Sequence, residues 1–337
     1  MRVRNWTRRL GQFASGGALA LAAAVALSNP AKAEEDIHFL LDWIPSGEMA
    51  AYYAGWSKGF WKEEGLNIKI SRGYGSGDTT AKVASNAADF GIADIAAVFA
   101  ARYRAKAPVQ LISSLYTFSP HSLFVLKSSG ITGFKDLAGK KIGITPGNSH
   151  KLHFPAVAER VGLNPDEVKW INSDASAMAA LLIGKKIDAA PFYSIHHYYQ
   201  NKAAKKAGEE ILVLPFVETG FAIYAASIIT TEKTIKERPE TVKKFLAGLW
   251  RSLKWARDNQ QEACKLHVAK VPEVALDDCM GSLKAMLGFV FNDSSEKTGL
   301  GKFEEKRLIF TYQVAAKGQK LDPNDDPNRA VNTSLLP

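Results

Sequence analysis

The sequence predicts an α/β fold divided into two lobes. Short runs rich in β-branched and aromatic residues alternate with stretches of helical periodicity along most of the chain, a pattern typical of α/β architecture. The chain has 337 residues, and the part beyond the first 33 is larger than a single hydrophobic core usually accommodates. We therefore expect two lobes, each with a mixed sheet flanked by helices.

The first 33 residues have the features of a cleaved secretory signal peptide. Their apolar stretch is only about a dozen residues long, which is too short to span a bilayer comfortably and disfavours a retained anchor. We expect a mature chain that begins near Glu34 and resides in the periplasm, with the Sec and twin-arginine export routes both open. The features are the arginines Arg2, Arg4, Arg8 and Arg9, the apolar stretch 16–27, and the A-x-A cleavage signal Ala31-Lys32-Ala33.

The net charge gives no reason to expect nucleic acid as a partner. The formal charge of the whole chain is +9. Residues 1–33 hold five basic and no acidic side chains, so the remaining chain carries a formal charge of +4. That balance is ordinary for a chain of this length.

The first series of predicted elements covers residues 37–126. A short apolar run over 37–41 predicts a strand, which Pro45 cannot continue. Apolar residues at helical spacing over 50–64 predict a helix, with Gly65 as the residue that follows its end. The glycine-rich segment 73–77 predicts a flexible turn before a helix that begins near Asp78. The other predicted strands are 66–71, 89–94, 109–115 and 123–126.

A second series of strands and helices follows. The predicted strands are 141–144, 168–171, 187–190, 211–214 and 222–229, and the predicted helices are 149–161, 176–183 and 196–206. From 233 onward the chain is mostly helical, and the helix over 241–257 places Phe245, Leu249, Leu253 and Ala256 on one apolar face. The tail from 321 is rich in Pro, Asn and Asp, which predicts loose packing.

The cysteines and histidines are the candidates for a disulfide and for a metal site. Cys264 and Cys279 are fifteen residues apart, and an oxidising compartment allows either a disulfide between two adjacent helices or two buried free thiols. His150 and His153 share a helix face, and His196 is followed directly by a second histidine, but no cysteine or carboxylate completes a ligand set at metal spacing. We expect no metal site and no cofactor.

Five sequence motifs stand out along the chain. They are Leu41-Asp42-Trp43-Ile44-Pro45; Ala54-Gly55-Trp56-Ser57-Lys58-Gly59-Phe60-Trp61-Lys62-Glu63-Glu64-Gly65-Leu66; Asp89-Phe90-Gly91 with Asp94; Phe134-Lys135-Asp136-Leu137-Ala138-Gly139-Lys140-Lys141-Ile142-Gly143; and Leu182-Ile183-Gly184-Lys185-Lys186-Ile187-Asp188-Ala189. They resemble, in the same order, the motifs of a known family, the ABC-importer substrate-binding proteins for nitrate, sulfonates, taurine and thiamine-pyrimidine precursors, in which the first motif is a D-W-x-P loop. The similarity covers roughly 37–260.

The resemblance implies a two-lobed periplasmic-binding-protein fold, type II-like, with two crossover hinge segments near 119–126 and 217–226. Lobe one would combine 34–120 with 223–337, and lobe two would be 121–222. The implied function is that of a monomeric protein that captures a small solute for an ABC permease in the inner membrane. A receptor that reads the closed form is a further possibility.

The candidate ligand-binding residues lie where the βα loops converge beyond the carboxyl ends of the predicted strands. They combine aromatic rings, which can stack on a flat ligand, with a few polar groups, the mixture that small-molecule pockets require. For each of them, core packing or helix capping is the competing role. The candidates are Trp43, Pro45, Tyr74, Gly75, Ser76, Asp94, Tyr116, Thr117, Asn148, Ser149, His150, Asp174, Phe192, Tyr193 and Glu218.

Two loops have both a functional and a simple structural interpretation. The amides of the 73–77 segment open a helix and could hold an anion or a carbonyl, or the segment could be a plain βα turn. The segment Pro146-Gly147-Asn148-Ser149 opens a second helix, where nitrate and sulfonate relatives contact their anion, or where Asn148 or Ser149 simply caps the helix.

The aromatic and acidic composition of these loops favours a planar heteroaromatic or aromatic solute, such as a thiamine-pyrimidine precursor. An alkyl sulfonate, taurine or an aromatic carboxylate is the alternative. A remote alternative is an enzyme, because pyrimidine-synthase relatives share this fold and use a histidine with a cysteine-rich motif. The chain has no clustered cysteines and no legible catalytic triad, so we expect it not to be an enzyme.

Overall fold

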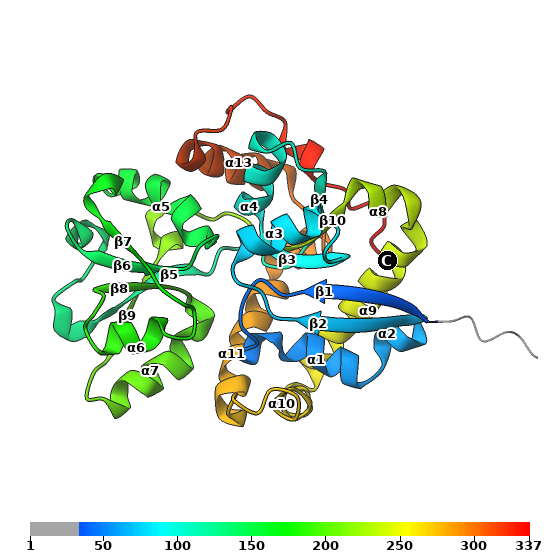
Figure 1. Cartoon of the computed structure of the whole chain (residues 1–337), viewed down its shortest axis with the longest axis horizontal. Helices are drawn as coiled ribbons and strands as arrows, with labels where there is room; N and C mark the ends of the chain where they lie inside the picture. The colour runs from blue at the N-terminus through cyan, green and yellow to red at the C-terminus, as the bar shows by residue number, and fades with distance from the viewer. Residues whose placement is uncertain (1–33) are drawn as a thin grey trace, which may run out of the picture. The chain divides into compact units, whose positions relative to one another are not determined.

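The computed structural model describes residues 34–337, so the expected signal peptide lies outside the described residues. These residues form two five-stranded sheets, each with helices packed on it (Figure 1). We call the part built on the first sheet lobe one and the part built on the second sheet lobe two. No helix in residues 34–337 is both long enough and apolar enough to cross a membrane.

The sheet of lobe one has the order β2-β1-β3-β10-β4. Strand β1 pairs in parallel with β2 and β3, whereas β10 runs antiparallel to β3 and β4. Strand β10 thus joins this sheet although it comes more than a hundred residues after β4. The strands are β1 (Glu35–Leu40), β2 (Leu66–Ser71), β3 (Phe90–Asp94), β4 (Val109–Ser114) and β10 (Ala226–Thr231).

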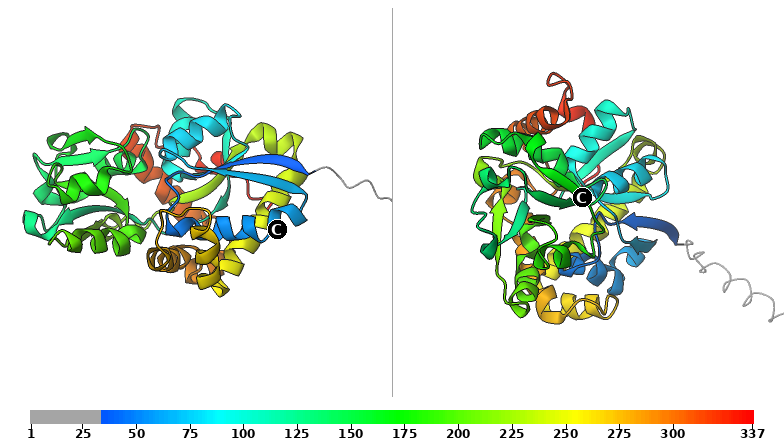
Figure 2. Two further views of the ribbon diagram at one scale, coloured as in Figure 1. Left: turned by 60° about the horizontal axis from the view of Figure 1, so that its bottom comes forward. Right: turned by 60° about the vertical axis from the view of Figure 1, so that its left-hand side comes forward.

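The sheet of lobe two repeats this plan with the order β7-β6-β8-β5-β9. Strand β6 is parallel to β7 and β8, and β5 is antiparallel to β8 and β9. The left view of Figure 2 shows this lobe in green beside lobe one. The strands are β5 (His121–Leu126), β6 (Lys141–Ile144), β7 (Lys169–Asn172), β8 (Ala189–Tyr193) and β9 (Ile211–Pro215).

The chain passes between the lobes twice, from β4 to β5 and back from β9 to β10. Both sheets are mixed and flanked by helices, which confirms the predicted fold class. The helices are α1 (Ala50–Ser57), α2 (Phe60–Glu63), α3 (Ser76–Ala84), α4 (Ile95–Phe99), α5 (Ser149–Arg160), α6 (Met178–Ile183), α7 (His197–Lys206), α8 (Glu232–Glu237), α9 (Pro239–Asp258), α10 (Gln260–Val268), α11 (Leu276–Val290), α12 (Asp293–Thr298) and α13 (Glu305–Gln319).

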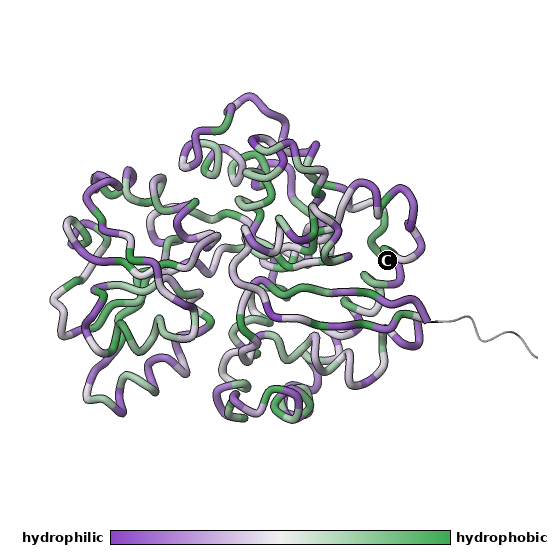
Figure 3. The backbone as a smooth tube through the Cα atoms, viewed as in Figure 1, coloured by the Kyte–Doolittle hydropathy of each residue, from purple (hydrophilic) through white to green (hydrophobic). Residues whose placement is uncertain are grey.

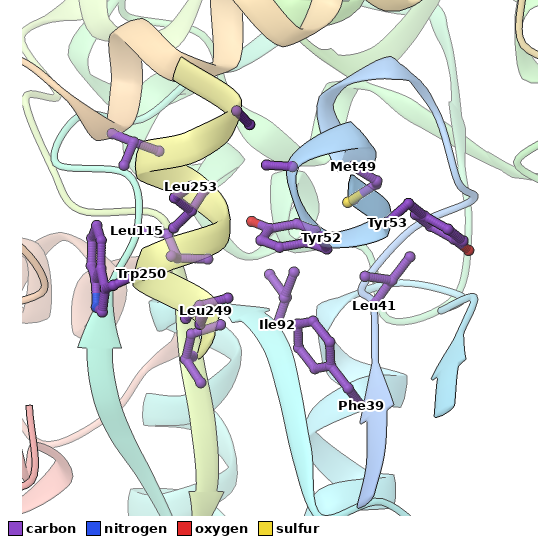
Figure 4. Packing of buried hydrophobic residues seen from close by; sticks show 14 of the residues in the cluster. Phe39, Leu41, Met49, Tyr52, Tyr53, Ile92, Leu115, Leu249, Trp250 and Leu253 are labelled. Carbon is purple, nitrogen blue, oxygen red and sulfur yellow. The ribbon is translucent and has the colours of Figure 1, made fainter. Parts of the chain in front are cut away.

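The core of lobe one lies between its sheet and helices α1, α9 and α11, and the apolar face predicted for 241–257 packs there. Phe245, Leu249, Leu253 and Ala256 are all fully buried. Figure 4 shows the ring of Tyr52 between helix α9 and the strand residues of this core. Figure 3 shows the same arrangement as hydrophobic stretches along the strands and hydrophilic segments in the outer loops. Burial of these side chains is the main source of the stability of the lobe.

Several predicted elements differ from the observed ones by a few residues at their ends, such as the strand predicted over 222–229, which is observed over Ala226–Thr231. Two predictions differ in kind. The helix predicted over 50–64 is divided into α1 and α2, because Gly59 has a φ of 75° and interrupts the helical backbone. The tail expected to pack loosely is instead anchored: Val331 bridges to Leu111, and Tyr103 donates a hydrogen bond to the carbonyl of Asp326. Buried aromatic partners therefore outweigh the polar composition of the tail.

A disulfide joins Cys264 on α10 to Cys279 on α11, with 5.7 Å between the Cα atoms. Of the two possibilities left open by the sequence, the disulfide is the one observed. Cys279 also packs on the backbone of Gly47, where an added Cβ would lie 2.5 Å from the Cys279 Cα. The disulfide therefore lies next to the short 3-10 helix η1 (Gly47–Met49), which borders the pocket described next.

The two lobes contact one another directly in this structure. The amide of Gly77 in lobe one donates to the carbonyl of Gly147 in lobe two, at 2.9 Å. A Cβ on Gly77 would come within 3.1 Å of Gly147, so glycine permits this approach of the two backbones. Farther out, Lys202 on α7 forms ion pairs with Asp277 and Asp278 on α11, at 2.6 and 2.9 Å.

Candidate functional site

A pocket lies between the lobes, where the loops that follow the strands meet. Both sheets contribute to it, as expected for an open α/β sheet in which ligands sit beyond the carboxyl ends of the strands. Lobe one supplies Asp42, Trp43, Glu48, Met49, Tyr52, Gly75, Ser76, Ile92, Tyr116 and Ala226, and lobe two supplies Asn148, Ser149, His150, Pro191, Phe192, Tyr193 and His196.

The positions of these side chains follow from their elements. Asp42 and Trp43 come directly after β1, and Tyr116 follows β4. Ser76 begins α3 and Ser149 begins α5, so two helix N-termini meet at the pocket. The floor includes Met49 and Tyr52, which belong to the hydrophobic core of lobe one. The pocket is thus fixed by packed elements rather than by free loops.

Nine of the fifteen predicted ligand-binding residues line this pocket. They are Trp43, Gly75, Ser76, Tyr116, Asn148, Ser149, His150, Phe192 and Tyr193. They come from both halves of the chain and converge because each follows a strand or begins a helix at the same end of its sheet.

The other six lie outside the pocket lining, although Asp94 lies just behind it. Asp94 is fully buried and accepts hydrogen bonds from the amide of Ala96 and from His153. Tyr74 is half-exposed and stacks under the guanidinium of Arg72, whose centre is 4.4 Å from the ring.

Three more of these six candidates form local hydrogen bonds or are exposed to solvent instead of lining the pocket. Thr117 hydrogen-bonds Asn292 on the lobe-one side. Asp174 is exposed and caps Ser176. Glu218 is exposed in the 3-10 helix η7 (Phe216–Thr219). Pro45, the sixth, ends the loop that presents Trp43 and is absent from the pocket lining.

The sequence analysis missed two of the most informative lining residues, Glu48 and His196. Glu48 lies on η1 and His196 ends the 3-10 helix η6 (Ser194–His196), and both side chains are buried. Their Oε1 and Nε2 atoms are 2.7 Å apart, so they form an ion pair between the lobes. A buried acid at the start of the apolar run Met49-Ala50-Ala51 was the available signal for Glu48.

Asp42 gives the pocket an unusual carboxyl group. Burial, and after it the negative charge of Glu48, raises the pKa of Asp42 from 3.8 to about 7. Its Oδ2 atom accepts a hydrogen bond from Ser76 at 3.3 Å. Near neutral pH this group can therefore serve either as a hydrogen-bond donor or as an acceptor with negative charge.

Glu48 behaves in the opposite way. Burial by itself would raise its pKa, but the charge and the hydrogen bond of His196 outweigh burial and lower the pKa below its ordinary value. The second oxygen of this carboxylate, Oε2, is buried and has no hydrogen-bond partner within residues 34–337. The same is true of the Nε1 donor of Trp43. The Nδ1 atom of His196 is a third such atom, so the pocket lining contains an unused acceptor, an unused donor and an unused ring nitrogen.

The remaining pocket groups are neutral. Burial lowers the pKa of His150 to about 3, and its Nδ1 and Nε2 atoms already contact Asn148 and the carbonyl of Phe192. Burial also raises the pKa of Tyr116 and of Tyr193 well above 10. These rings therefore offer apolar faces and hydroxyl groups but no charge.

The two helix-opening loops are largely occupied by internal hydrogen bonds. The amides of Gly73, Gly75 and Gly77 donate to the carbonyls of Trp43, Asp42 and Gly147. Asn148 caps α5 by accepting from the amide of His150 at 2.9 Å. The capping interpretation of Asn148 is thus confirmed, and three amides of the 73–77 segment are not available to an anion.

Comparison with known proteins gives relatives of two kinds. The chain is 25% identical over 284 residues to the 4-amino-5-hydroxymethyl-2-methylpyrimidine phosphate synthase THI11 of Saccharomyces cerevisiae, covering 80% of this chain and 83% of the relative. It is 24% identical to the riboflavin-binding protein RibY of Chloroflexus aurantiacus, covering 90% of this chain and 86% of the relative.

A solved structure confirms the fold. The alkanesulfonate-binding protein SsuA of Xanthomonas axonopodis pv. citri, bound to MOPS, superimposes with a TM-score of 0.70 at 12% identity, covering 90% of this chain and 99% of that chain. The chain therefore has the periplasmic-binding-protein fold that the resemblance implied.

One expectation is corrected by these relatives. The sequence analysis expected the chain not to be an enzyme, but several curated relatives, in Saccharomyces cerevisiae and Candida albicans, are named as pyrimidine phosphate synthases. That expectation relied on the absence of clustered cysteines in this chain. The argument fails because the chain is similar to synthases over most of its length although it has no such cluster. A family model described as NMT1/THI5 like matches residues 46–263, which is more than half of the chain, and the chain belongs to that family.

Proposed function

We propose that this protein binds a small planar heteroaromatic solute that carries an amino group, of the thiamine-pyrimidine-precursor type, between its two lobes. The observation that carries the proposal is that two polar atoms of the pocket lining, Glu48 Oε2 and Trp43 Nε1, are buried without a hydrogen-bond partner within residues 34–337. A buried acceptor without a partner costs stability, so a ligand that donates to it gains affinity. An aminopyrimidine offers a donor amino group next to an acceptor ring nitrogen, which matches this pair.

The charges of the pocket support the same class. Its lining residues include two carboxyl groups, those of Asp42 and Glu48, and no lysine or arginine. A bare sulfonate or carboxylate would therefore meet negative charge, and the one cationic group of the lining, His196, is already paired with Glu48, which is unfavourable for an anion in a desolvated site. An amino-substituted ring instead gains from both carboxyl groups, with Tyr116, Phe192 and Tyr193 as apolar neighbours.

The names of the relatives support the same compound class. They make or bind compounds with heteroaromatic rings, an aminopyrimidine phosphate and riboflavin.

We infer further that the protein works as the binding component of an ABC importer in the periplasm. The proposed lobes are 34–120 with 223–337, and 121–222, and the ligand would stabilise their closed arrangement for reading by the permease. The A-x-A signal Ala31-Lys32-Ala33 supports export. N-terminal sequencing of periplasmic protein should give a mature chain that starts near Glu34, and a start at Met1 would contradict export with cleavage.

A thermal-shift screen tests the ligand class. The panel is 4-amino-5-hydroxymethyl-2-methylpyrimidine, taurine and benzoate, each measured on the wild type and on Glu48→Gln. A true ligand at 100 times its Kd adds about 2.7 kcal/mol to the free energy of unfolding. We expect a shift with the pyrimidine that is reduced in Glu48→Gln. A shift with taurine or benzoate alone would assign the site to anions instead.

The synthase relatives favour a second candidate function, formation of an aminopyrimidine phosphate. It is tested by incubating the protein with the small-molecule fraction of a cell extract and measuring 4-amino-5-hydroxymethyl-2-methylpyrimidine phosphate by mass spectrometry. Time-dependent formation that requires the protein and is lost in His196→Asn would establish synthesis. Binding of the pyrimidine without any formation of the phosphate would favour capture.

A further inference from the structure

A second cluster of titratable side chains lies behind the pocket, at the junction of the lobes. Asp94 ends β3 in lobe one, His121 begins β5 directly after the first crossover, and His153 lies on α5 in lobe two. All three are buried, and one ligand atom from each lies within 4.8 Å of those of the others. Three sequence-distant segments therefore present two imidazoles and one carboxylate to a single point.

The spacing of the atoms suits one metal ion. Asp94 Oδ1 is 2.9 Å from His153 Nε2, and Asp94 Oδ2 is 3.6 Å from His121 Nε2. In a tetrahedral site with metal–ligand bonds of about 2.0–2.2 Å, neighbouring ligand atoms are about 3.3 Å apart. The two measured separations fall on either side of that value, and each involves a different oxygen of the Asp94 carboxylate.

The orientation of His121 is also that of a metal ligand. Its Nδ1 atom is 2.7 Å from Ser119 Oγ, which holds the ring and leaves Nε2 facing the cluster. Metal-bound histidines regularly have such a hydrogen bond on the second ring nitrogen.

One oxygen of the Asp94 carboxylate is free to bind a cation. Asp94 is fully buried, and its Oδ2 atom has no hydrogen-bond partner within residues 34–337. A buried carboxylate oxygen without a partner is costly, and a cation at the cluster would remove that cost.

We propose that Asp94, His121 and His153 bind one divalent first-row transition-metal ion, with Zn²⁺ as the probe. Two imidazoles and a carboxylate are a ligand set that such ions accept, with further positions left for water or another oxygen. Ser149 Oγ, 2.8 Å from His121 Nε2, is the oxygen available in the protein. Because Asp94 and His153 belong to different lobes, the ion joins the lobes. The sequence analysis missed this set because it searched for ligands at short spacing around His150 and His153.

The test uses full-length protein freed of metal with a chelator. Calorimetry should show one Zn²⁺ per chain, and Co²⁺ should give the visible absorption of an imidazole-ligated ion. We expect His153→Asn to weaken Zn²⁺ binding at least about 10-fold, and Ser119→Ala to weaken it by about 10- to 100-fold. The control is His197→Asn, which removes a histidine outside the cluster and should leave the affinity unchanged.

Two results would overturn the proposal. One is a wild-type protein that gives no Co²⁺ absorption and no Zn²⁺ heat. The other is equal loss of affinity in His153→Asn and His197→Asn, which would place the metal on surface histidines. If His153→Asn does not fold, the proposal is tested by the Co²⁺ absorption of the wild type together with the Zn²⁺ affinity of Ser119→Ala. A failure here leaves the proposed solute site intact, since none of the three ligands lines the pocket.

Discussion

Glu48 of lobe one and His196 of lobe two meet in a buried ion pair, with 2.7 Å between Oε1 and Nε2. Both side chains line the pocket, so the contact that joins the lobes is also part of the proposed binding surface. If the lobes close on a solute as proposed, closure and capture are coupled at this pair of residues. Exposed bridges elsewhere between the lobes do not have this property.

We predict that Glu48→Gln weakens solute binding at least 10-fold. The variant removes the negative charge and leaves His196 with a weaker partner in a buried site, where loss of one member of a pair is costly. The matched control is Lys202→Gln, which breaks the two more exposed ion pairs between the lobes, and exposed ion pairs contribute little. Calorimetric titration measures both. Equal losses in the two variants would show that the buried pair has no special role.

Replacement of Trp43 should affect binding much more than folding. Trp43 is partly buried and lines the pocket, and its Nε1 donor is unused. The control is Trp61→Ala, because Trp61 is fully buried, donates to the carbonyl of Phe245 and is absent from the pocket. We expect Trp61→Ala to lower the free energy of unfolding by about 3–5 kcal/mol. Urea denaturation and titration of each variant check this, and unchanged affinity in Trp43→Ala would return Trp43 to a packing role.

The raised pKa of Asp42 predicts a pH-dependent stability. Since burial raises the pKa from 3.8 to about 7, the folded state holds this proton more tightly than the unfolded state does. The stabilisation is complete below pH 4 and is lost as the pH rises to about 7, a change of about 4 kcal/mol at most. Asp42→Asn lacks this loss, so its stability relative to the wild type should increase from pH 5 to pH 8. Parallel stability curves for the two proteins would contradict the shifted pKa.

Gly77→Ala should impair closure of the lobes. An added Cβ would lie 3.1 Å from Gly147 across the junction, although the backbone of Gly77 itself does not need a positive φ. We expect weaker solute binding with little change in the thermal midpoint of the apo protein. Gly133→Ala is the control, because an added Cβ there meets nothing within 4 Å. Similar affinities for the two variants would mean that the 77–147 contact does not take part in closure.

The disulfide should contribute to stability and not to recognition. It closes a loop of 15 residues, for which the loss of unfolded-state entropy amounts to about 3 kcal/mol. The double variant Cys264→Ser with Cys279→Ser should lose about that much free energy of unfolding while it keeps the solute affinity. A large loss of affinity at retained stability would instead show that the disulfide holds η1, and with it Glu48, in place.

The sequence predicted the elements well where their bounds are set by neighbouring residues, such as a capping side chain. Strands β2 and β6 have the predicted bounds, and α5 begins at the predicted residue because Asn148 caps it. The division of the predicted 50–64 helix depends on the left-handed backbone of Gly59. Glycine adopts helical and left-handed conformations about equally readily, so its presence alone does not predict which one occurs.

The site was harder to predict for a physical reason. Residues directly after strands converge through sheet geometry, and this rule found Trp43, Tyr116 and Tyr193. Glu48 and His196 are 148 residues apart and meet only through the tertiary structure, which no local pattern records. The cluster of Asp94, His121 and His153 depends in the same way on the tertiary structure.

Small-angle scattering with and without 4-amino-5-hydroxymethyl-2-methylpyrimidine tests most directly whether a solute is held by closure of the lobes. The wild type should show a smaller radius of gyration at saturating solute than in its absence, and Gly77→Ala should show a smaller change than Gly133→Ala. A radius that stays the same for wild-type protein that calorimetry shows to be saturated would contradict the account.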